Sequence, residues 1–147
     1  MKYNIRPYLK QDKEEVIELW FRSTVTGQSF LPKEFWESVK PLLREKYIPI
    51  AETWIAEQDG KILGFISLLD HLIGGLFVDL SSQGKGIGGA LIRHAQEIRT
   101  QPLSVEVFEK NERARRFYKK CGFTFKAQTL QEESGEMVFV LHQPSSG

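Results

Sequence analysis

Apolar and polar residues recur with two different periods along the chain, and the changes of period divide it into helices and strands. Residues 3–9 form a short strand-like run, and the apolar residues that follow Asp12 recur at helical spacing. Asp12 with Glu15 three residues later matches a capping box, which predicts the start of this helix. A second helix is expected to open at Pro32 and to be kinked or split by Pro41.

From Thr53 onward, short apolar runs indicate strands. Asp59-Gly60 stands between two of these runs and predicts a hairpin, and residues 75–78 and 103–108 predict two further strands. Between these two strands an apolar stripe with helical spacing predicts a helix. Its members are Ile87, Ala90, Leu91, His94, Ala95 and Ile98.

The last part of the chain predicts one more helix and a closing hairpin. Asn111 is a favourable N-cap, and Gly122 stands where a glycine commonly follows the end of a helix. Residues 123–130 and 137–142 have the pattern of two strands. The predicted order is β-α-α-β-β-β-α-β-α-β-β, an α/β protein of the α+β kind with helices on the faces of a mixed sheet.

Composition limits the functional classes. The length of 147 residues suits one domain, expected over 1–142, followed by a loose polar tail at 143–147. Twenty basic and nineteen acidic residues give no broad footprint for nucleic acid, and one cysteine excludes an internal disulfide and a cysteine metal cluster. Neither a signal peptide nor a membrane-spanning stretch is apparent, so we expect a cytoplasmic protein with no metal and no nucleic-acid or membrane partner.

The glycine-rich segment from Gln83 to Gly89 carries the strongest indication of function. It lies between a predicted strand and a predicted helix, where unpaired N–H groups and the helix dipole favour a phosphate. Several glycines in so short a segment also allow a ligand to approach the backbone closely. The segment therefore predicts a phosphate-bearing ligand.

Two nucleotide motifs fit this segment poorly. Gly84, Gly86 and Gly89 match G-x-G-x-x-G, and Glu106 lies roughly 20 residues further on, where a ribose-binding acid is expected. However, residues 79–83 separate these glycines from the strand, and too little chain remains for a full dinucleotide-binding fold. A Walker loop is excluded because Gly86, rather than Ser or Thr, follows the lysine.

Two motifs together resemble the GNAT superfamily of acetyl-CoA-dependent N-acetyltransferases. Gln83-Gly84-Lys85-Gly86-Ile87-Gly88 is similar to its Q/R-x-x-G-x-G/A signature, and residues 111–123 are similar to N-x-x-A-x-x-F/L-Y-x-x-x-G-F. The likeness covers about 1–142. Trp20 and Arg22-Ser23, with Phe30-Leu31, resemble the small bacterial YjaB-type branch.

The resemblance implies a binding site for coenzyme A. Its pyrophosphate would lie on backbone N–H groups of the glycine-rich segment, and its pantetheine arm would run along the preceding strand, with the Val78 N–H near the thioester oxygen. One or two cations of the helix after Asn111 would meet the 3′-phosphate. The implied cofactor-binding residues are Leu76, Phe77, Val78, Gln83, Gly84, Lys85, Gly86, Ile87, Gly88, Gly89, Asn111, Phe117 and Lys120.

The resemblance also implies catalytic residues. Tyr118 would protonate the leaving thiolate, since a tyrosine holds its proton at neutral pH. His71 and Glu106 are candidates for the base that deprotonates the amine, with a slight preference for His71, whose side chain titrates in the useful range. Glu106 resembles the base position of ribosomal-protein alanine N-acetyltransferases, and a chain of waters is a third possibility.

The expected activity is transfer of acetyl from acetyl-CoA to a primary amine by direct attack in a ternary complex. The acceptor is a protein lysine, a protein N-terminus or a small-molecule amine, and the protein is expected to be a monomer or homodimer. The segment around Gly27 to Leu31 would form one wall of the acceptor pocket. One alternative is a non-catalytic acyl-CoA-binding module of the same fold, and another is an oxidoreductase with a nucleotide cofactor.

Overall fold

Seven strands form one sheet in the computed structural model, which describes residues 2–143. The strands are β1 (Asn4–Pro7), β2 (Glu52–Gln58), β3 (Lys61–Leu69), β4 (Leu72–Val78), β5 (Ser104–Phe108), β6 (Thr124–Gln131) and β7 (Glu136–His142). They lie side by side in the order β1-β2-β3-β4-β5-β7-β6. Only the β4–β5 pair is parallel, and the other neighbours are antiparallel.

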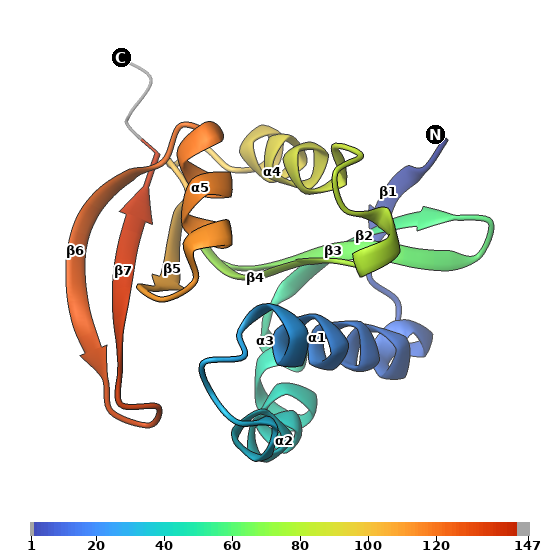
Figure 1. Cartoon of the computed structure of the whole chain (residues 1–147). Coiled ribbons are helices and arrows are strands. Elements are labelled where there is room, and N and C mark those ends of the chain that lie inside the picture. The colour runs from blue at the N-terminus through green and yellow to red at the C-terminus, as the bar shows by residue number, and fades with distance from the viewer. Residues whose placement is uncertain (1, 144–147) are drawn as a thin grey trace.

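Helices cover both faces of this sheet. They are α1 (Lys13–Gly27), α2 (Lys33–Leu42), the short α3 (Ile48–Ile50), α4 (Ile87–Ile98) and α5 (Glu112–Lys120). Figure 1 shows α1 and α2 on one side of the sheet, and α4 and α5 on the other. The main elements follow the predicted order, and the predicted mixed α+β class is confirmed.

Each face of the sheet has its own hydrophobic core. Leu91 and Ile92 of α4 belong to one core, and Ile17 and Leu19 of α1 belong to the other. Neighbouring residues of β2 enter different cores, because successive side chains of a strand point to opposite faces. A sheet covered on both faces explains why β3 is a nearly continuous apolar run.

Several local predictions are confirmed. The Asn111 side chain caps α5, since its Oδ1 accepts a hydrogen bond from the Ala114 N–H at 3.1 Å. Gly122 follows α5 with a φ of +92°. At the tip of the β2–β3 hairpin, Asp59 and Gly60 have φ values of +50° and +78°, as a tight hairpin turn requires.

The predicted capping box at the start of α1 is wrong. The Asp12 carboxylate accepts a hydrogen bond from the Leu9 N–H at 2.7 Å and makes no bond to the first turn of α1. Glu15 accepts a hydrogen bond from the Ile62 N–H at 2.9 Å instead. Tertiary contacts engage both carboxylates, and Glu15 thereby ties α1 to the start of β3.

Two segments differ in detail from the prediction. β4 begins at Leu72 rather than at residue 75, because Asp70, with a φ of +56°, already turns the chain back from β3. α2 runs through Pro41 and then passes into a π-helical turn, Leu43–Tyr47. Pro41 therefore does not split the helix: the backbone stays helical over residues 33–50, and its irregularity is the π-helical turn after Pro41.

The end of the chain was expected to be a loose tail from 143 to 147. Gln143 donates its N–H to the Leu103 carbonyl at 2.9 Å, and residues 144–147 lie outside the described residues. Within residues 2–143 no helix is both long and apolar enough to cross a membrane. The cytoplasmic location stays a prediction.

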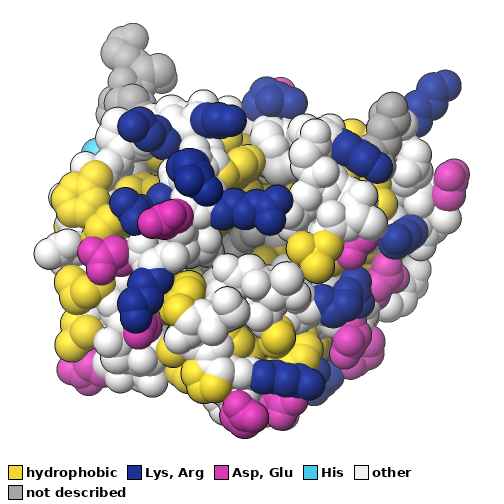
Figure 2. Space-filling view, viewed as in Figure 1, with side chains coloured by type: hydrophobic (Ala, Val, Ile, Leu, Met, Phe, Trp, Pro, Cys, Tyr) yellow, Lys and Arg dark blue, Asp and Glu magenta, His cyan; other side chains and the backbone are white. Residues whose placement is uncertain are grey.

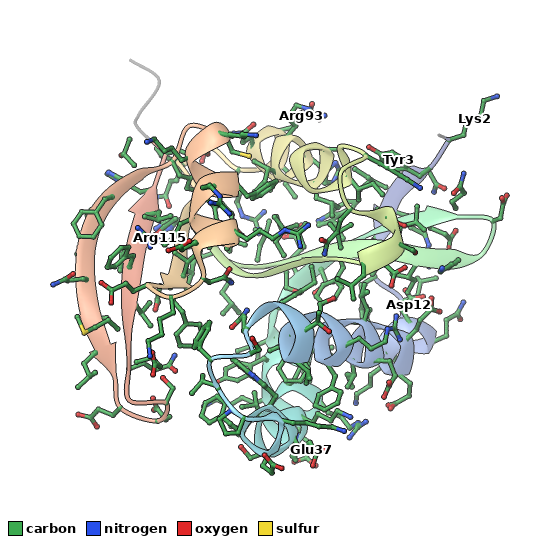
Figure 3. The ribbon with its side chains drawn as sticks, in the orientation of Figure 1. Lys2, Tyr3, Asp12, Glu37, Arg93 and Arg115 are labelled. Atoms are coloured by element: carbon green, nitrogen blue, oxygen red, sulfur yellow. The ribbon has the colours of Figure 1, made fainter. Side chains whose placement is uncertain are left out.

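One ionic cluster ties β1 to the start of α1. Arg6 donates hydrogen bonds to both carboxylate oxygens of Asp12, at 2.8 and 3.0 Å, and to Glu57 on β2 at 2.7 Å. Figure 3 shows Asp12 at the start of α1, where its side chain is only 7% exposed. The hydrogen bonds from Arg6 hold the pKa of Asp12 below its ordinary value.

We predict that Arg6→Met lowers the free energy of unfolding at pH 7 by about 2–4 kcal/mol, because it leaves the Asp12 carboxylate buried without its partner. The folded-state pKa of Asp12 is depressed, so its contribution is present above the unfolded pKa of about 3.9 and is lost as pH falls through the folded value. The deficit should therefore shrink in acid. Urea unfolding at several pH values measures this, and Arg44→Met, which breaks an exposed pair with Glu14, should change little.

Candidate active site

The strands β4 and β5 are hydrogen-bonded neighbours only at their first residues. Leu72 pairs with Ser104 and Ile73 with Val105, and no further pair follows in the register. Gly74 has no partner in the antiparallel register with β3, so it is the extra residue of a β-bulge. Because a bulge bends its strand, β4 diverges from β5 beyond Ile73 and a gap opens between them.

This gap opens into a cavity of about 670 Å³. Its walls come from α1, the α1–α2 connection, β4, the loop before α4, β5 and α5. Most residues predicted for the site lie in this lining. They are Leu76, Phe77, Val78, Gln83, Gly84, Gly86, Ile87, Gly88, Gly89, Glu106, Asn111, Phe117 and Tyr118.

The glycine-rich loop takes the backbone form that a phosphate site needs. Gly84 and Gly86 have φ values of +81° and +83°, in the left-handed region that residues with a Cβ rarely adopt. Gly86 directly precedes α4, whose first turn has N–H groups without a partner inside the helix. An anion at this edge of the cavity would meet those N–H groups and the positive end of the helix dipole.

Other residues of the loop have a structural role. The Gln83 side chain donates a hydrogen bond to the Val78 carbonyl at 3.0 Å, which fastens the loop to the end of β4. A Cβ on Gly88 would lie 3.1 Å from the ring of Phe117, so the close approach of α4 to α5 favours a glycine there. The glycines of the loop therefore serve two purposes: Gly84 and Gly86 allow its backbone turns, and Gly88 allows α4 to pack closely on α5.

Tyr118 lies on α5 at the α4/α5 side of the gap. Its side chain is buried, and its ring packs edge-on against Phe117 and Phe123, with centroids 5.2 Å apart in both pairs. Burial raises the pKa of Tyr118 above its ordinary value, because the phenolate would lose its hydration. The hydroxyl therefore keeps its proton at neutral pH and can serve as a proton donor.

The two candidate bases lie in different surroundings. Glu106 stands between Val105 and Val107, which face the α4/α5 core, so its side chain belongs to the opposite face of the sheet and is part of the cavity lining. His71 precedes β4 at the paired end of the two strands and lies outside the lining, with its Nδ1 3.6 Å from an Asp70 carboxylate oxygen. The geometry does not support the slight preference for His71.

The basic residues near the site are arranged differently from the prediction. Lys85 and Lys120 are exposed and lie outside the cavity lining, whereas Arg113 of α5 is part of it. Figure 2 shows Lys and Arg side chains gathered over α4 and α5. Arg113 precedes Phe117 by one helical turn, and this spacing was the available signal that it shares the cavity-facing side.

The wall formed by α1, the α1–α2 connection and α2 is aromatic and polar. Trp20 and Trp36 contribute rings to it, and Gly27 and Gln28 belong to the segment predicted to line an acceptor pocket. Among the described residues, Ser23 Oγ, Thr24 Oγ1 and Gln28 Oε1 are buried without a hydrogen-bond partner, and all three residues line the cavity. Sequence reasoning missed Ser23 and Thr24 as site residues, because nothing in a helical pattern marks an unpaired hydroxyl.

Comparison with known proteins decides the family. A sequence model described as the acetyltransferase (GNAT) domain matches residues 49–125, more than half of the chain. The chain belongs to the GNAT family. The matched region contains β4, the glycine-rich loop and α5, which are the elements around the cavity on its α4/α5 side.

Full-length relatives agree with this GNAT membership. The chain is 33% identical to the peptidyl-lysine N-acetyltransferase YiaC of Escherichia coli K12, over 95% of this chain and 96% of that protein. Identity to the peptidyl-lysine N-acetyltransferase YjaB of the same organism is 32%, over 92% of each. The predicted likeness to the YjaB-type branch is thereby confirmed.

Solved structures match the whole fold. The solution structure of apo YjaB from Escherichia coli superposes with a TM-score of 0.87 at 28% identity, covering 99% of this chain and 100% of that one. The PaiA N-acetyltransferase of Thermoplasma acidophilum, solved in complex with coenzyme A, has a TM-score of 0.84 at 19% identity over 99% and 100% of the two chains. This second match supports the fold alone.

The GNAT protein is thus an acetyl-CoA-dependent N-acetyltransferase, as predicted. The oxidoreductase alternative is wrong, since the glycine-rich loop belongs to a GNAT domain rather than to a dinucleotide-binding fold. The alternative of a non-catalytic module of the same fold is set aside because both full-length relatives, YiaC and YjaB, are named N-acetyltransferases. The predicted absence of a metal stays a prediction.

We predict that Gly86→Glu weakens acetyl-CoA binding well over tenfold, more than about 1.4 kcal/mol. The new carboxylate would occupy the place of the pyrophosphate and repel it. Gly86→Ala is the matched control, because it imposes the same strain at a φ of +83° without adding a charge, and a Cβ there meets no atom within 4 Å. Calorimetric titration measures both variants, and equal losses in the two would contradict a phosphate site at this loop.

Proposed function

We propose that this GNAT enzyme transfers the acetyl group of acetyl-CoA directly to the side-chain amine of a lysine in a protein. Both substrates would occupy the cavity between β4 and β5 at the same time. The observation that carries the proposal is that Tyr118 and Glu106 line one cavity from opposite faces of the sheet. A proton donor and a proton acceptor are thereby available on the two sides of a single reaction centre.

The coenzyme would approach from the side of α4 and α5. The left-handed glycines of the loop and the first turn of α4 supply N–H groups for the pyrophosphate, and Arg113 supplies a cation. Beyond Ile73 the edge of β4 that faces β5 has no strand partner in the register. The pantetheine amides can pair with this edge along Leu76 to Val78, as an added strand would.

The amine would enter from the side of α1 and α2. Aromatic rings of Trp20, Trp36 and Phe108 form an apolar passage suited to the methylene chain of a lysine. Ser23, Thr24 and Gln28 line this side, and their buried side-chain oxygens have no partner among the described residues. Turned toward the cavity, these oxygens can accept the three N–H donors of an ammonium group. YiaC and YjaB are named peptidyl-lysine N-acetyltransferases, which supports this class of acceptor.

In the reaction Glu106 first takes one proton from the ammonium group, and the neutral amine nitrogen then attacks the thioester carbon. The C–S bond breaks, and the sulfur leaves as a thiolate that takes the proton of the Tyr118 hydroxyl. Desolvation opposes both the phenolate and the thiolate, so the raised pKa of Tyr118 does not by itself make this transfer unfavourable. The nitrogen loses its second proton to solvent as the amide forms. Solvent also takes the proton held by Glu106 and restores the proton of Tyr118.

Direct transfer needs no acyl-enzyme. Cys121, the only cysteine of the chain, lies outside the cavity lining. Burial raises the pKa of its thiol, which lowers the share of the nucleophilic thiolate at neutral pH. These observations favour a ternary complex, in which the amine itself is the nucleophile, over an acyl-enzyme on Cys121.

For the acceptor class we expect lysine-containing peptides to be acetylated with a higher kcat/KM than free polyamines or peptides whose only amine is the N-terminus. Thr24→Val should raise the KM for the lysine peptide several-fold, because it removes one buried oxygen that the ammonium would meet. The KM for acetyl-CoA should stay unchanged, and thermal stability should not fall, since the lost hydroxyl has no partner in the folded protein. A polyamine preferred over every lysine peptide would overturn the proposed acceptor class.

Tyr118→Phe keeps the buried ring and removes only the hydroxyl. We expect kcat to fall by ~10²–10⁴, as for the loss of a positioned acid, with the Kd for acetyl-CoA nearly unchanged. The deficit should shrink with an acetyl thioester whose leaving thiol is more acidic. Single-turnover kinetics isolates the chemical step, and a variant with wild-type rates there would show that Tyr118 is not the acid.

For the base we expect Glu106→Gln to lower kcat/KM for the amine by ~10²–10⁴ near neutral pH. The deficit should shrink at high pH, where the amine is already neutral in solution. His71→Ala is the matched control and should leave the pH profile of kcat/KM in place, because His71 lies outside the cavity lining. The reverse pattern would restore His71 as the base.

A further inference from the structure

The outer edge of the sheet is formed by β6, which has β7 as its single neighbour. Every residue of β6 from Thr124 to Leu130 is exposed. Phe125 and Leu130 are each 56% exposed, although both are large and apolar. Figure 1 shows this strand as the outermost ribbon of the β6–β7 hairpin, and hydrophobic side chains appear along the same edge in Figure 2.

The two exposed apolar residues lie on the same face of the sheet. Phe125 pairs with Leu141 but Ala127 pairs with Val140, so Lys126 is the extra residue of a β-bulge. In a regular strand, residues 125 and 128 would point to opposite faces. The extra residue shifts the alternation by one, so Phe125, Gln128 and Leu130 share one face. This face also lines a second groove beside α5.

The groove is basic and has an aromatic floor. It measures about 660 Å³ and is lined by residues of α5, β6 and β7. Arg115 lies over the ring of Phe139, 5.0 Å from its centroid (Figure 3). Arg116 and Lys119 also line the groove, and neither forms an ion pair with any residue in the range 2–143. Glu112 is the one acidic residue of the lining, so the three cations leave the groove basic.

The turn between β6 and β7 carries the opposite charge. Glu132 and Glu133 are exposed there and, within the described part of the chain, have no cationic partner. Glu136 is already paired with Lys110 at 3.1 Å. One copy of the chain thus presents an unpaired basic groove at one end of β6 and unpaired carboxylates at the other.

We propose that two copies of this chain form a symmetric dimer through antiparallel pairing of β6 with β6 of the second copy. In a two-fold pair centred on Gln128, the bulge brings Phe125 of each copy opposite Leu130 of the other. Continuing this register brings Glu132 and Glu133 of one copy beside Phe123 and Gly122 of the other, at the end of the basic groove. Edge pairing, apolar contact and charge complementarity coincide in this one register.

The oligomeric state tests the proposal first. Sedimentation equilibrium over a roughly hundredfold range of concentration should show a monomer–dimer equilibrium. Leu130→Lys should weaken the dimer roughly tenfold or more, because it sets a cation against the partner's basic groove twice per dimer. Ile50→Lys is the matched control, since Ile50 is 63% exposed on α3 and should leave the equilibrium unchanged. A protein that is monomeric throughout, or a dimer that Leu130→Lys does not weaken, would overturn the proposal.

Cross-linking tests the register. In a Cys121→Ser background, Gln128→Cys should form a disulfide-linked dimer rapidly on mild oxidation, because directly opposed strand residues have Cα atoms about 4.5–5.5 Å apart, within disulfide range. Thr129→Cys is the control. Its thiol would lie opposite Ala127 of the second copy rather than opposite another cysteine, so we expect the disulfide to form slowly. Equal rates for the two variants would contradict the register.

The charges provide a third readout. Glu133→Lys should weaken the dimer, because it sets a cation against the basic groove of the second copy. Adding Lys119→Glu in the same chain should restore the dimer, because the two-fold symmetry then places the new lysine of each copy beside the new glutamate of the other. Failure of the second change to restore association would count against the proposal. Circular dichroism on each variant confirms that the chain is folded.

Discussion

Beyond Ile73 and Val105, β4 and β5 no longer exchange backbone hydrogen bonds, and the rest of the site depends on that divergence. A parallel pair that continued along both strands would fill the space between them with backbone. The bulge at Gly74 bends β4 away at the residue where pairing stops. It therefore provides both a cavity and a strand edge whose N–H and carbonyl groups are free of a strand partner.

The sheet also separates the two halves of the proposed chemistry. Helices α4 and α5 cover one face and adjoin the glycine-rich loop and Tyr118, while α1 and α2 cover the other face, to which Glu106 belongs. Each face has its own core, so either half of the site is supported by independent packing. The gap is the place where groups from the two faces can reach one reaction centre.

Local patterns were sufficient for much of this. The N-cap at Asn111, the glycine after α5, the Asp59-Gly60 turn and the mixed class follow from interactions within a few residues, which a sequence displays directly. The GNAT resemblance rested on the glycine loop and the α5 motif, and both line the cavity as expected. The capping box failed because Asp12 and Glu15 bond to Leu9, Arg6 and Ile62, and a bond to Ile62 cannot be read from local spacing.

By itself the sequence determined the order of elements, the family resemblance and most of the residues predicted for the coenzyme that line the cavity, because these depend on periodicity and on contiguous motifs. Tertiary structure alone decided which candidate base shares the cavity with Tyr118, which cation of α5 faces it, and that Ser23 and Thr24 form its far wall. It also decided that β6 stands at the edge of the sheet with Phe125 and Leu130 on one face. Each of these is set by the order of the strands, by a bulge or by the rotation of a helix against the sheet, and none of the three leaves a mark in the local pattern of residues.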